Sequence, residues 1–330
     1  MQPDQETPQS LVAFARRFTD ERACATYLAE LRWPGGFRCP CGGTRAWHHT
    51  ARPRVFQCAD CRQQHSVTAG TVMHRTKVPL VEWFWAAWTF AQDKRGVSAL
   101  HLSRLLGRRY ETVWRLLHKL RDALAEDPAA FPLKGVVEVD ETYTGGKTSR
   151  GRGGRSLADP RRGLVVLATE RKPTEAGDPG VRGTGVRCGD TRMAVVESAG
   201  AKDLLGFLTT VCAPGTTVRT DGWSGYNGAG DAGLDRLRLI EGRPENGSVL
   251  FPLVHTLFSN MKVWISGTFH GVSKTWLPAY VKEFAYRLNR RFRIHEGDLW
   301  SFALRRLVRG TWRPWAVRND EMAPRRPAPA

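Results

Sequence analysis

VEVDETYTGGK at residues 137–147 and VRTDGWSGYN at residues 218–227 decide the fold that we expect for this chain. Each segment ends a strand-forming run with an acid, because Asp140 follows 135–139 and Asp221 follows 217–220. A carboxylate at the end of a buried strand is unfavourable unless a cation or a donor compensates it. Two such acids from separate strands predict a divalent-metal site that acts on a phosphate backbone. The alternative is two strand-end turns in which Asp is a polar cap.

The charge balance of the whole chain supports a polyanionic partner. The 330 residues include 50 Lys and Arg against 32 Asp and Glu, which gives a net charge of +18. Nucleic acid is the first expectation for such an excess, and a membrane surface is the weaker one. We expect no membrane span, because no apolar run approaches the roughly 18 residues that crossing a bilayer requires.

Four of the seven cysteines cluster in the N-terminal part of the chain. Cys39 and Cys41 form one pair, and Cys58 and Cys61 form a second. Two such knuckles can form a tetrahedral structural Zn²⁺ site, which also indicates a reducing compartment. The first pair is C-x-C and one residue short of the usual spacing, so His48 or His49 is kept as a substitute ligand. The alternative is four unrelated reduced thiols.

Apolar periodicity predicts helices over 8–32, 79–93 and 96–124, with the last one broken at Gly107. The tryptophans of 79–93 are expected in the core. The broken pair predicts a helix-turn-helix, and the alternative is an ordinary helical hairpin with a solvated basic face. The basic and polar side chains that the second helix is expected to expose to DNA are Arg108, Arg109, Thr112, Arg115, Lys119 and Arg121.

The pattern changes to mixed α/β after residue 134. Strands are predicted over 135–140, 163–169, 192–198 and 216–221, with a helix over 201–211 before the last strand and further helices after it. The Gly- and Arg-rich insertion 145–162 is expected to be a flexible loop that orders on nucleic acid. The tail after Trp315 is expected to be disordered.

The order of these parts resembles the zinc-ribbon insertion-sequence transposases of the Asp-Asp-Glu type, over about Leu11 to Arg291. The likeness rests on several long motifs in the correct order: RWPGGFRCPCG (32–42), FQCADCRQQHSVTAGTVMHRTKVPL (56–80), GVSALHLSRLLGRRYETVWRLLHKLR (96–121), VEVDETYTGGK (137–147), TDGWSGY (220–226), GTFHGVS (267–273) and YVKEFAYRLNRR (280–291). The resemblance implies a multi-domain α+β protein with a ribonuclease H-like mixed α/β catalytic domain. The expected parts are helices and zinc ribbon (1–76), helix-turn-helix region (77–130), catalytic domain (131–310) and tail (311–330).

By that likeness, Asp140 and Asp221 are the family's two metal-binding aspartates and bind catalytic Mg²⁺ or Mn²⁺. The family's glutamate lies seven residues before a lysine, and Lys262 lies seven residues after His255. We therefore rank His255 first, and Asn260 second, as the residue that takes the place of the family's catalytic glutamate. Glu283 is a third candidate, with structural pairing to nearby arginines as its more natural role. A histidine nitrogen there would shift the metal preference from Mg²⁺ toward Mn²⁺.

The resemblance also implies the reaction and the partners. Water would cleave the element end, and the freed 3′ hydroxyl would attack target DNA, with Lys262 on a nearby phosphate. Glu138 and Glu141 are expected to face away from the metal. The further backbone contacts are Arg287, Arg290 and Arg291. We expect double-stranded DNA as partner, a homodimer or higher on DNA, and a cytoplasmic, nucleoid-associated protein. The alternatives are a non-catalytic DNA-binding protein derived from a transposase, and a nuclease of the same fold.

Overall fold

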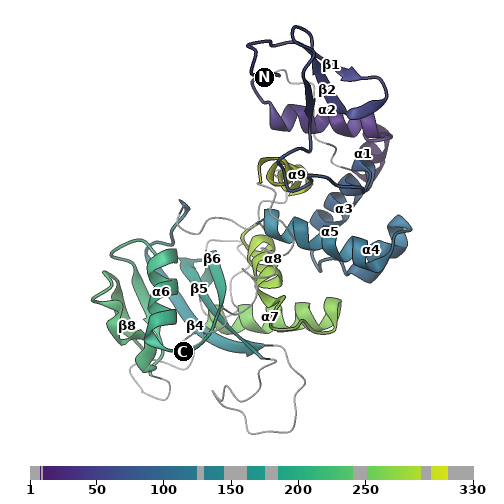
Figure 1. Ribbon diagram of the computed structural model, residues 1–330. Helices are drawn as coiled ribbons and strands as arrows, with labels where there is room; N and C mark the ends of the chain where they lie inside the picture. Colours follow the sequence, from purple (N-terminus) through teal and green to yellow (C-terminus); the bar gives the residue numbers. More distant parts are fainter. Residues whose placement is uncertain are drawn as a thin grey trace, which may run out of the picture. The chain divides into compact units, whose positions relative to one another are not determined.

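The computed structural model forms two compact units (Figure 1). It describes residues 8, 10–124, 130–144, 162–174, 185–240, 251–290 and 299–310. The first unit holds the described residues up to Leu124 together with 299–310, and the second holds those between 130 and 290. The expected flexible insertion, apart from Arg162, and the expected disordered tail lie outside the described residues. Within the described ranges, no helix combines the length and the apolar composition that crossing a bilayer would need.

The first unit begins with two helices, α1 (Leu11–Arg17) and α2 (Glu21–Arg32), where the sequence predicts one. The prediction of a single helix over 8–32 is wrong because Asp20 starts a new helix. Its Oδ1 accepts a hydrogen bond from the Ala23 backbone N–H at 2.8 Å, in the manner of an N-cap. Apolar periodicity continues across this break, so it does not reveal the interruption.

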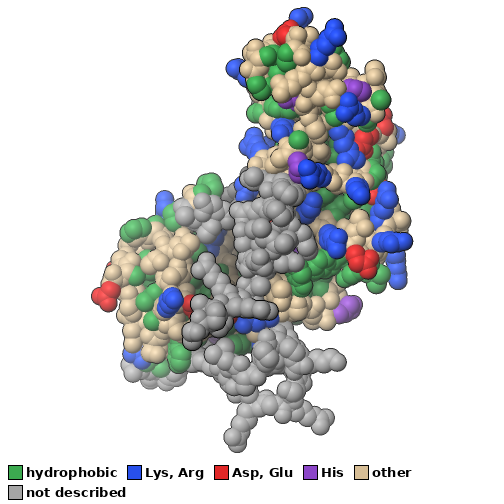
Figure 2. All heavy atoms as spheres, in the orientation of Figure 1, with side chains coloured by type: hydrophobic (Ala, Val, Ile, Leu, Met, Phe, Trp, Pro, Cys, Tyr) green, Lys and Arg blue, Asp and Glu red, His purple; other side chains and the backbone are tan. Residues whose placement is uncertain are grey.

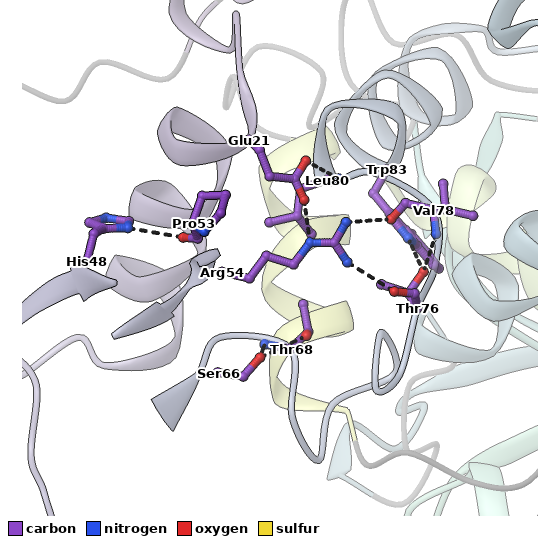
Figure 3. Close-up of polar contacts among 10 residues, drawn as sticks. All are labelled: Glu21, His48, Pro53, Arg54, Ser66, Thr68, Thr76, Val78, Leu80 and Trp83. Atoms are coloured by element: carbon purple, nitrogen blue, oxygen red, sulfur yellow. Dashed lines mark hydrogen bonds and ion pairs between the residues drawn. The ribbon is translucent and has the colours of Figure 1, made fainter. Parts of the chain in front are cut away.

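A three-stranded antiparallel sheet follows, in the order β1 (Ala46–His49), β2 (Arg52–Cys58) and β3 (Gln64–Ser66). Arg54 attaches this sheet to the helices: it pairs with Glu21 of α2 and donates to the carbonyls of Thr76 at 3.0 Å and Val78 at 3.1 Å (Figure 3). Glu21 in turn accepts the Leu80 backbone N–H at 2.8 Å. One ion pair therefore joins the sheet, α2 and the start of the next helix.

The helical part of the first unit consists of α3 (Leu80–Gln92), α4 (Ala99–Leu106), α5 (Tyr110–Ala123) and α9 (Leu299–Arg309). Trp83 and Trp88 are buried, as expected for core residues, whereas Trp85 is half-buried, with its ring against Phe14. Gly107 ends α4 with φ 61°, in the left-handed region that favours glycine, which confirms the predicted break.

The last described helix, α9, belongs to this unit and not to the sheet-containing one. Trp300 is fully buried and its ring lies against Phe14, Phe18, Tyr27 and Trp88. The expectation that the catalytic domain extends to residue 310 is therefore wrong. The apolar side of α9 is covered by α1, α2 and α3, which all lie more than 200 residues earlier in the chain.

The second unit contains a five-stranded mixed sheet. Its strands are β4 (Val136–Thr144), β5 (Gly163–Pro173), β6 (Val186–Val196), β7 (Thr217–Thr220) and β8 (Asp235–Arg238), in the order β6-β5-β4-β7-β8. The first three strands pair antiparallel, whereas β7 pairs parallel with both β4 and β8. Four of these strands and α6 (Ala201–Val211) match the prediction, and β8 was not predicted. A short 3-10 helix, η2 (Ser224–Ala229), follows β7.

Helices cover both faces of this sheet (Figure 1). Val137 and Val139 of β4 pack in the core with α6, whereas α7 (Pro252–Phe269) and α8 (Leu277–Arg290) cover the other face. Side chains along a strand alternate between faces, so Glu138 points to the same side as Asp140. The expectation that Glu138 and Glu141 both face away from the metal site is therefore wrong for Glu138, which lies two residues from Asp140. It treated Glu138 like Glu141, which is adjacent to Asp140 and points to the other side.

Candidate active site and zinc centre

The four clustered cysteines converge in the first unit. The sulfur atoms of Cys39, Cys41, Cys58 and Cys61 all lie within 4.8 Å of one another. Two of the separations are 3.5 Å, between Cys39 and Cys61, and 3.7 Å, between Cys41 and Cys58. A tetrahedral zinc ion with Zn–S bonds of about 2.3 Å requires sulfurs about 3.8 Å apart, so the four residues fit Zn²⁺.

The short C-x-C knuckle reaches the site because of the two glycines that follow it. Gly42 has φ 90°, and a Cβ at Gly43 would lie 2.8 Å from the Cys58 sulfur. The Cys61 backbone N–H lowers the pKa of Cys58 to about 7, which favours the thiolate that binds zinc. No histidine substitute is needed, because all four cysteines reach the site. His48 instead contacts the Thr26 hydroxyl and the Pro53 carbonyl, each at 3.0 Å, and His49 contacts Ala51 and Arg52.

In the second unit, Asp140 and Asp221 lie at the same level on neighbouring parallel strands. Asp221 directly follows β7, whereas the prediction that Asp140 ends its strand is wrong, because β4 continues to Thr144. The register pairs Glu138 of β4 with Arg219 of β7, and two further residues along each strand lead to Asp140 and Asp221. Both acids act electrostatically on Tyr226, a buried residue of η2. Burial first, then the charges of Glu141, Asp140 and Asp221, raise the pKa of its hydroxyl, which donates to Glu141 at 2.6 Å. The two acids therefore act on one buried group.

Arg236 of β8 holds the loop that carries Asp221. Its guanidinium donates to the backbone carbonyls of Asp221 at 3.0 Å and Trp223 at 2.9 Å, and to the Thr220 hydroxyl at 2.8 Å. The Asp221 carboxylate itself accepts the Trp223 backbone N–H at 2.9 Å. Sequence reasoning missed Arg236, because a single arginine in a short polar strand carries no motif.

Helix α7 brings His255 to Asp140, with His255 Nε2 at 3.4 Å from Asp140 Oδ2. Lys262 lies on the same side of the helix and donates to the Thr142 hydroxyl of β4 at 2.8 Å. Burial, followed by the charge of Arg162, lowers the pKa of Lys262, while Asp140 opposes this shift. A spacing of seven residues returns to one helix face, which explains why both side chains reach β4.

The other two candidates for the third position lie elsewhere. Asn260 is exposed and five residues from His255, which places it about 140° away around the helix axis. Glu283 on α8 is fully buried and pairs with Arg287 at 2.7 Å, so its expected structural pairing is confirmed.

A catalytic divalent ion would have two carboxylates and one imidazole available in this part of the molecule. Among the described residues, the four cysteines are the group whose ligand atoms converge closely enough to hold one ion, and Asp140, Asp221 and His255 do not form such a group in this conformation. The donor set fits Mn²⁺ or Mg²⁺, with the nitrogen ligand favouring Mn²⁺.

The basic residues expected to contact DNA differ in how available they are. Arg109 and Arg115 are exposed, and Thr112 and Lys119 are half-buried. Arg108 forms a two-bond pair with Glu82 at 2.6 and 2.8 Å. Arg121 is buried, so the expectation that it is exposed is wrong. Figure 2 shows more Lys and Arg than Asp and Glu side chains on the visible face of the first unit.

The arginines of α8 are partly engaged within the second unit. Arg287 pairs with Glu283, and its side chain is only 11% exposed. Arg290 lies over the Tyr286 ring, 4.3 Å from its centroid. Arg291 lies outside the described residues. A phosphate contact by Arg287 would therefore compete with an internal ion pair.

Comparison with known proteins matches both halves of this arrangement. Residues 19–64 match the transposase zinc-ribbon domain, and residues 132–289 match the ISXO2-like transposase domain. The chain is also 30% identical over 284 residues to an uncharacterized protein in the transposable element ISH50 of Halobacterium salinarum, over 82% of this chain and 92% of that relative. A four-cysteine ribbon and a mixed sheet with Asp140 and Asp221 at the same level of neighbouring strands are thus combined in a chain that belongs to the insertion-sequence transposases with a zinc ribbon and an ISXO2-like transposase domain.

Proposed function

We propose that this protein is a DNA transposase that binds the ends of its insertion sequence and catalyses metal-dependent DNA cleavage and strand transfer. The observation that carries the proposal is the position of Asp140 and Asp221 on adjacent parallel strands, with His255 3.4 Å from Asp140. The strand order β6-β5-β4-β7-β8, with β6, β5 and β4 antiparallel, supports a ribonuclease H-like fold for this unit.

Asp140, Asp221 and His255 would hold divalent ions, Mn²⁺ or Mg²⁺, which supply activation of the attacking oxygen and stabilisation of the leaving oxygen. Cleavage by water and attack by the 3′ hydroxyl are both in-line phosphoryl transfers, so the protein acts mainly by positioning and by charge. Lys262 lies over β4 close to Asp140 and would contact a phosphate beside the cleaved bond. Asn260 is the weaker candidate for the third position, because it faces away from His255.

DNA binding is assigned to the basic helices of the first unit. Helices α4 and α5 are joined by a short turn at Gly107, which supports a helix-turn-helix in which α5 is the recognition helix. Arg109 and Arg115 are its exposed basic residues, and Thr112 and Lys119 lie beside them. Because two element ends must be joined, the active form is expected to be at least a dimer on double-stranded DNA.

The test is cleavage of a DNA fragment that carries the element end, with Mg²⁺ or Mn²⁺ added. We expect end-specific nicking by the wild type and none by Asp140→Ala or Asp221→Ala. Asp231→Ala is the matched control, because Asp231 is exposed in the turn that precedes β8 and should leave nicking unchanged. His255→Ala should reduce nicking, and Asn260→Ala should not. DNA binding without nicking in either metal would instead indicate a non-catalytic DNA-binding protein.

A further inference from the structure

Glu138 is a fully buried carboxylate whose two oxygens both have partners. Its Oε1 accepts a hydrogen bond from Arg171 Nη1 at 2.6 Å. Its Oε2 accepts the backbone N–H groups of Leu253 at 3.0 Å and Val254 at 3.4 Å. A buried charge is tolerated only when such partners compensate it. With both oxygens in use, Glu138 is not a further metal ligand.

The two backbone donors lie at the beginning of α7. The first N–H groups of a helix have no partner within the helix, and a side chain at the N-cap usually accepts one of them. In α7 the N-cap residue is Phe251, whose side chain makes no capping hydrogen bond. Glu138 supplies the missing acceptor from β4 and places a negative charge at the positive end of the helix dipole.

Glu138 lies on the same side of β4 as the residues that face the active site. Along this strand, Glu138 binds Leu253, Asp140 lies against His255, and Thr142 accepts from Lys262. The three contacts run in the same order along β4 and along α7. Of the three contacts, the one made by Glu138 is the most deeply buried, and it holds the start of α7 near Asp140.

We propose that Glu138 is a positioning residue, which docks the start of α7 on β4 so that His255 and Lys262 stand over the catalytic strand. The docking itself depends only on the contacts above, and its effect on the reaction rests on the proposed function. A loss of docking should therefore make hydrogen exchange at the start of α7 faster and lower the turnover number. DNA binding should not become weaker.

The test is Glu138→Gln in the full chain, which keeps the size of the side chain but removes its charge. Glutamine has one acceptor oxygen, so it cannot accept both from Arg171 and from the start of α7 as Glu138 does. Hydrogen exchange of the peptide over 251–258 should therefore become about five-fold faster or more, the size of effect expected from a weakened helix cap. Exchange in α6 should not change. Glu170→Gln is the matched control and should leave exchange over 251–258 unchanged. Like Glu138, Glu170 of the neighbouring strand β5 pairs with a basic side chain, here Lys172, and accepts a backbone N–H, that of Lys134 at 3.0 Å.

Cleavage kinetics give the second readout. Glu138→Gln should lower kcat by about 10- to 100-fold, as for other displacements of a reacting group, with KM for the DNA end unchanged. Glu138→Asp keeps the charge, so it should retain more activity than Glu138→Gln. If Glu138→Gln does not fold, the same two measurements can be made on Glu138→Asp and compared with the wild type. Unchanged exchange over 251–258 would overturn the proposal, as would faster exchange with unchanged kcat. Faster exchange in a protein whose wild type never cleaves DNA would support the docking and refute the proposed function.

Discussion

At the scale of single residues, the proposed active site has less negative charge than a set of three carboxylates would have. Asp140 and Asp221 supply the two acids, His255 adds a neutral or cationic ring, and Lys262 and Arg162 add positive charge close by. Positive side chains suit a phosphate backbone, but they weaken the attraction for a divalent ion. The imidazole in place of a third carboxylate is the reason for the expected preference for Mn²⁺, because Mn²⁺ accepts nitrogen ligands more readily than Mg²⁺ does.

A second residue, His118 of α5, predicts how stability depends on pH. Its ring is fully buried, and burial, with Arg121 as the lesser cause, lowers its pKa from 6.5 to about 3. Between these two values the unfolded chain binds a proton that the folded chain does not, so stability falls as the pH falls. His118→Phe should remove up to about 2 kcal/mol of the stability loss between pH 7 and pH 5.

Urea unfolding at the two pH values measures this effect. His101→Phe is the control, because His101 of α4 is exposed and should leave the pH dependence as it is in the wild type. An equal loss of stability in the wild type and in His118→Phe would show that His118 does not titrate in the unfolding equilibrium.

Single residues also mark the limit of sequence-based prediction at the site. Asp140, Asp221, His255 and Lys262 could be proposed from the sequence, because the family resemblance indicates all four and predicted strand ends indicate the two acids. Glu138 and Arg236 could not, because their roles depend on the backbone groups of segments far along the chain. Arg236 reaches Asp221 across the β7–β8 pair, and no local pattern reveals that contact.

At the scale of secondary-structure elements, the zinc ribbon gives the clearest prediction. Cys41→Ser should lose zinc, because the C-x-C knuckle brings Cys41 to the other three sulfurs. Chelation of the wild type should unfold β1–β3, since a structural zinc ion contributes on the order of 10 kcal/mol to the folding of a small domain. Metal content after dialysis and thermal unfolding measure the two effects.

Cys188→Ser serves as the matched control for zinc binding. Cys188 is a half-buried cysteine on β6 of the other unit, so its replacement should leave one zinc ion per chain. Full zinc content in Cys41→Ser would show that three cysteines are sufficient, and that His65, whose Nε2 lies 3.4 Å from the Cys39 sulfur, is a possible fourth ligand.

Elements with a strong apolar pattern were predicted correctly, and those defined by polar contacts were not. The runs that form β4, β5, β6 and β7 are apolar enough to be recognised as strands. The β8 segment, Asp235–Arg238, has three charged residues of four, and it is a strand only because β7 offers it a parallel partner. The α1–α2 break likewise depends on one capping hydrogen bond, that of Asp20.

At the scale of the whole molecule, the first unit is completed by a helix from the far end of the chain. Sequence order suggested that residues 299–310 continue the catalytic domain, since they follow it directly. Packing overrides sequence order here, because Trp300 is fully buried among the aromatic rings of α1, α2 and α3. Leu307 adds a backbone contact, in which its carbonyl accepts the Val72 N–H at 3.2 Å.

The packing of α9 on α1, α2 and α3 predicts that a substitution in α9 destabilises the first unit. Trp300→Ala should lower the free energy of unfolding by about 3–5 kcal/mol, as expected when a large buried aromatic side chain is truncated. Trp47→Ala is the control, because Trp47 is 51% exposed and its loss should cost about 0.5 kcal/mol or less. Urea unfolding followed by hydrogen exchange would locate the effect. If exchange in α1 and α3 stays as slow in Trp300→Ala as in the wild type, α9 does not complete their core, and the unit would be expected to fold from residues 10–124 alone.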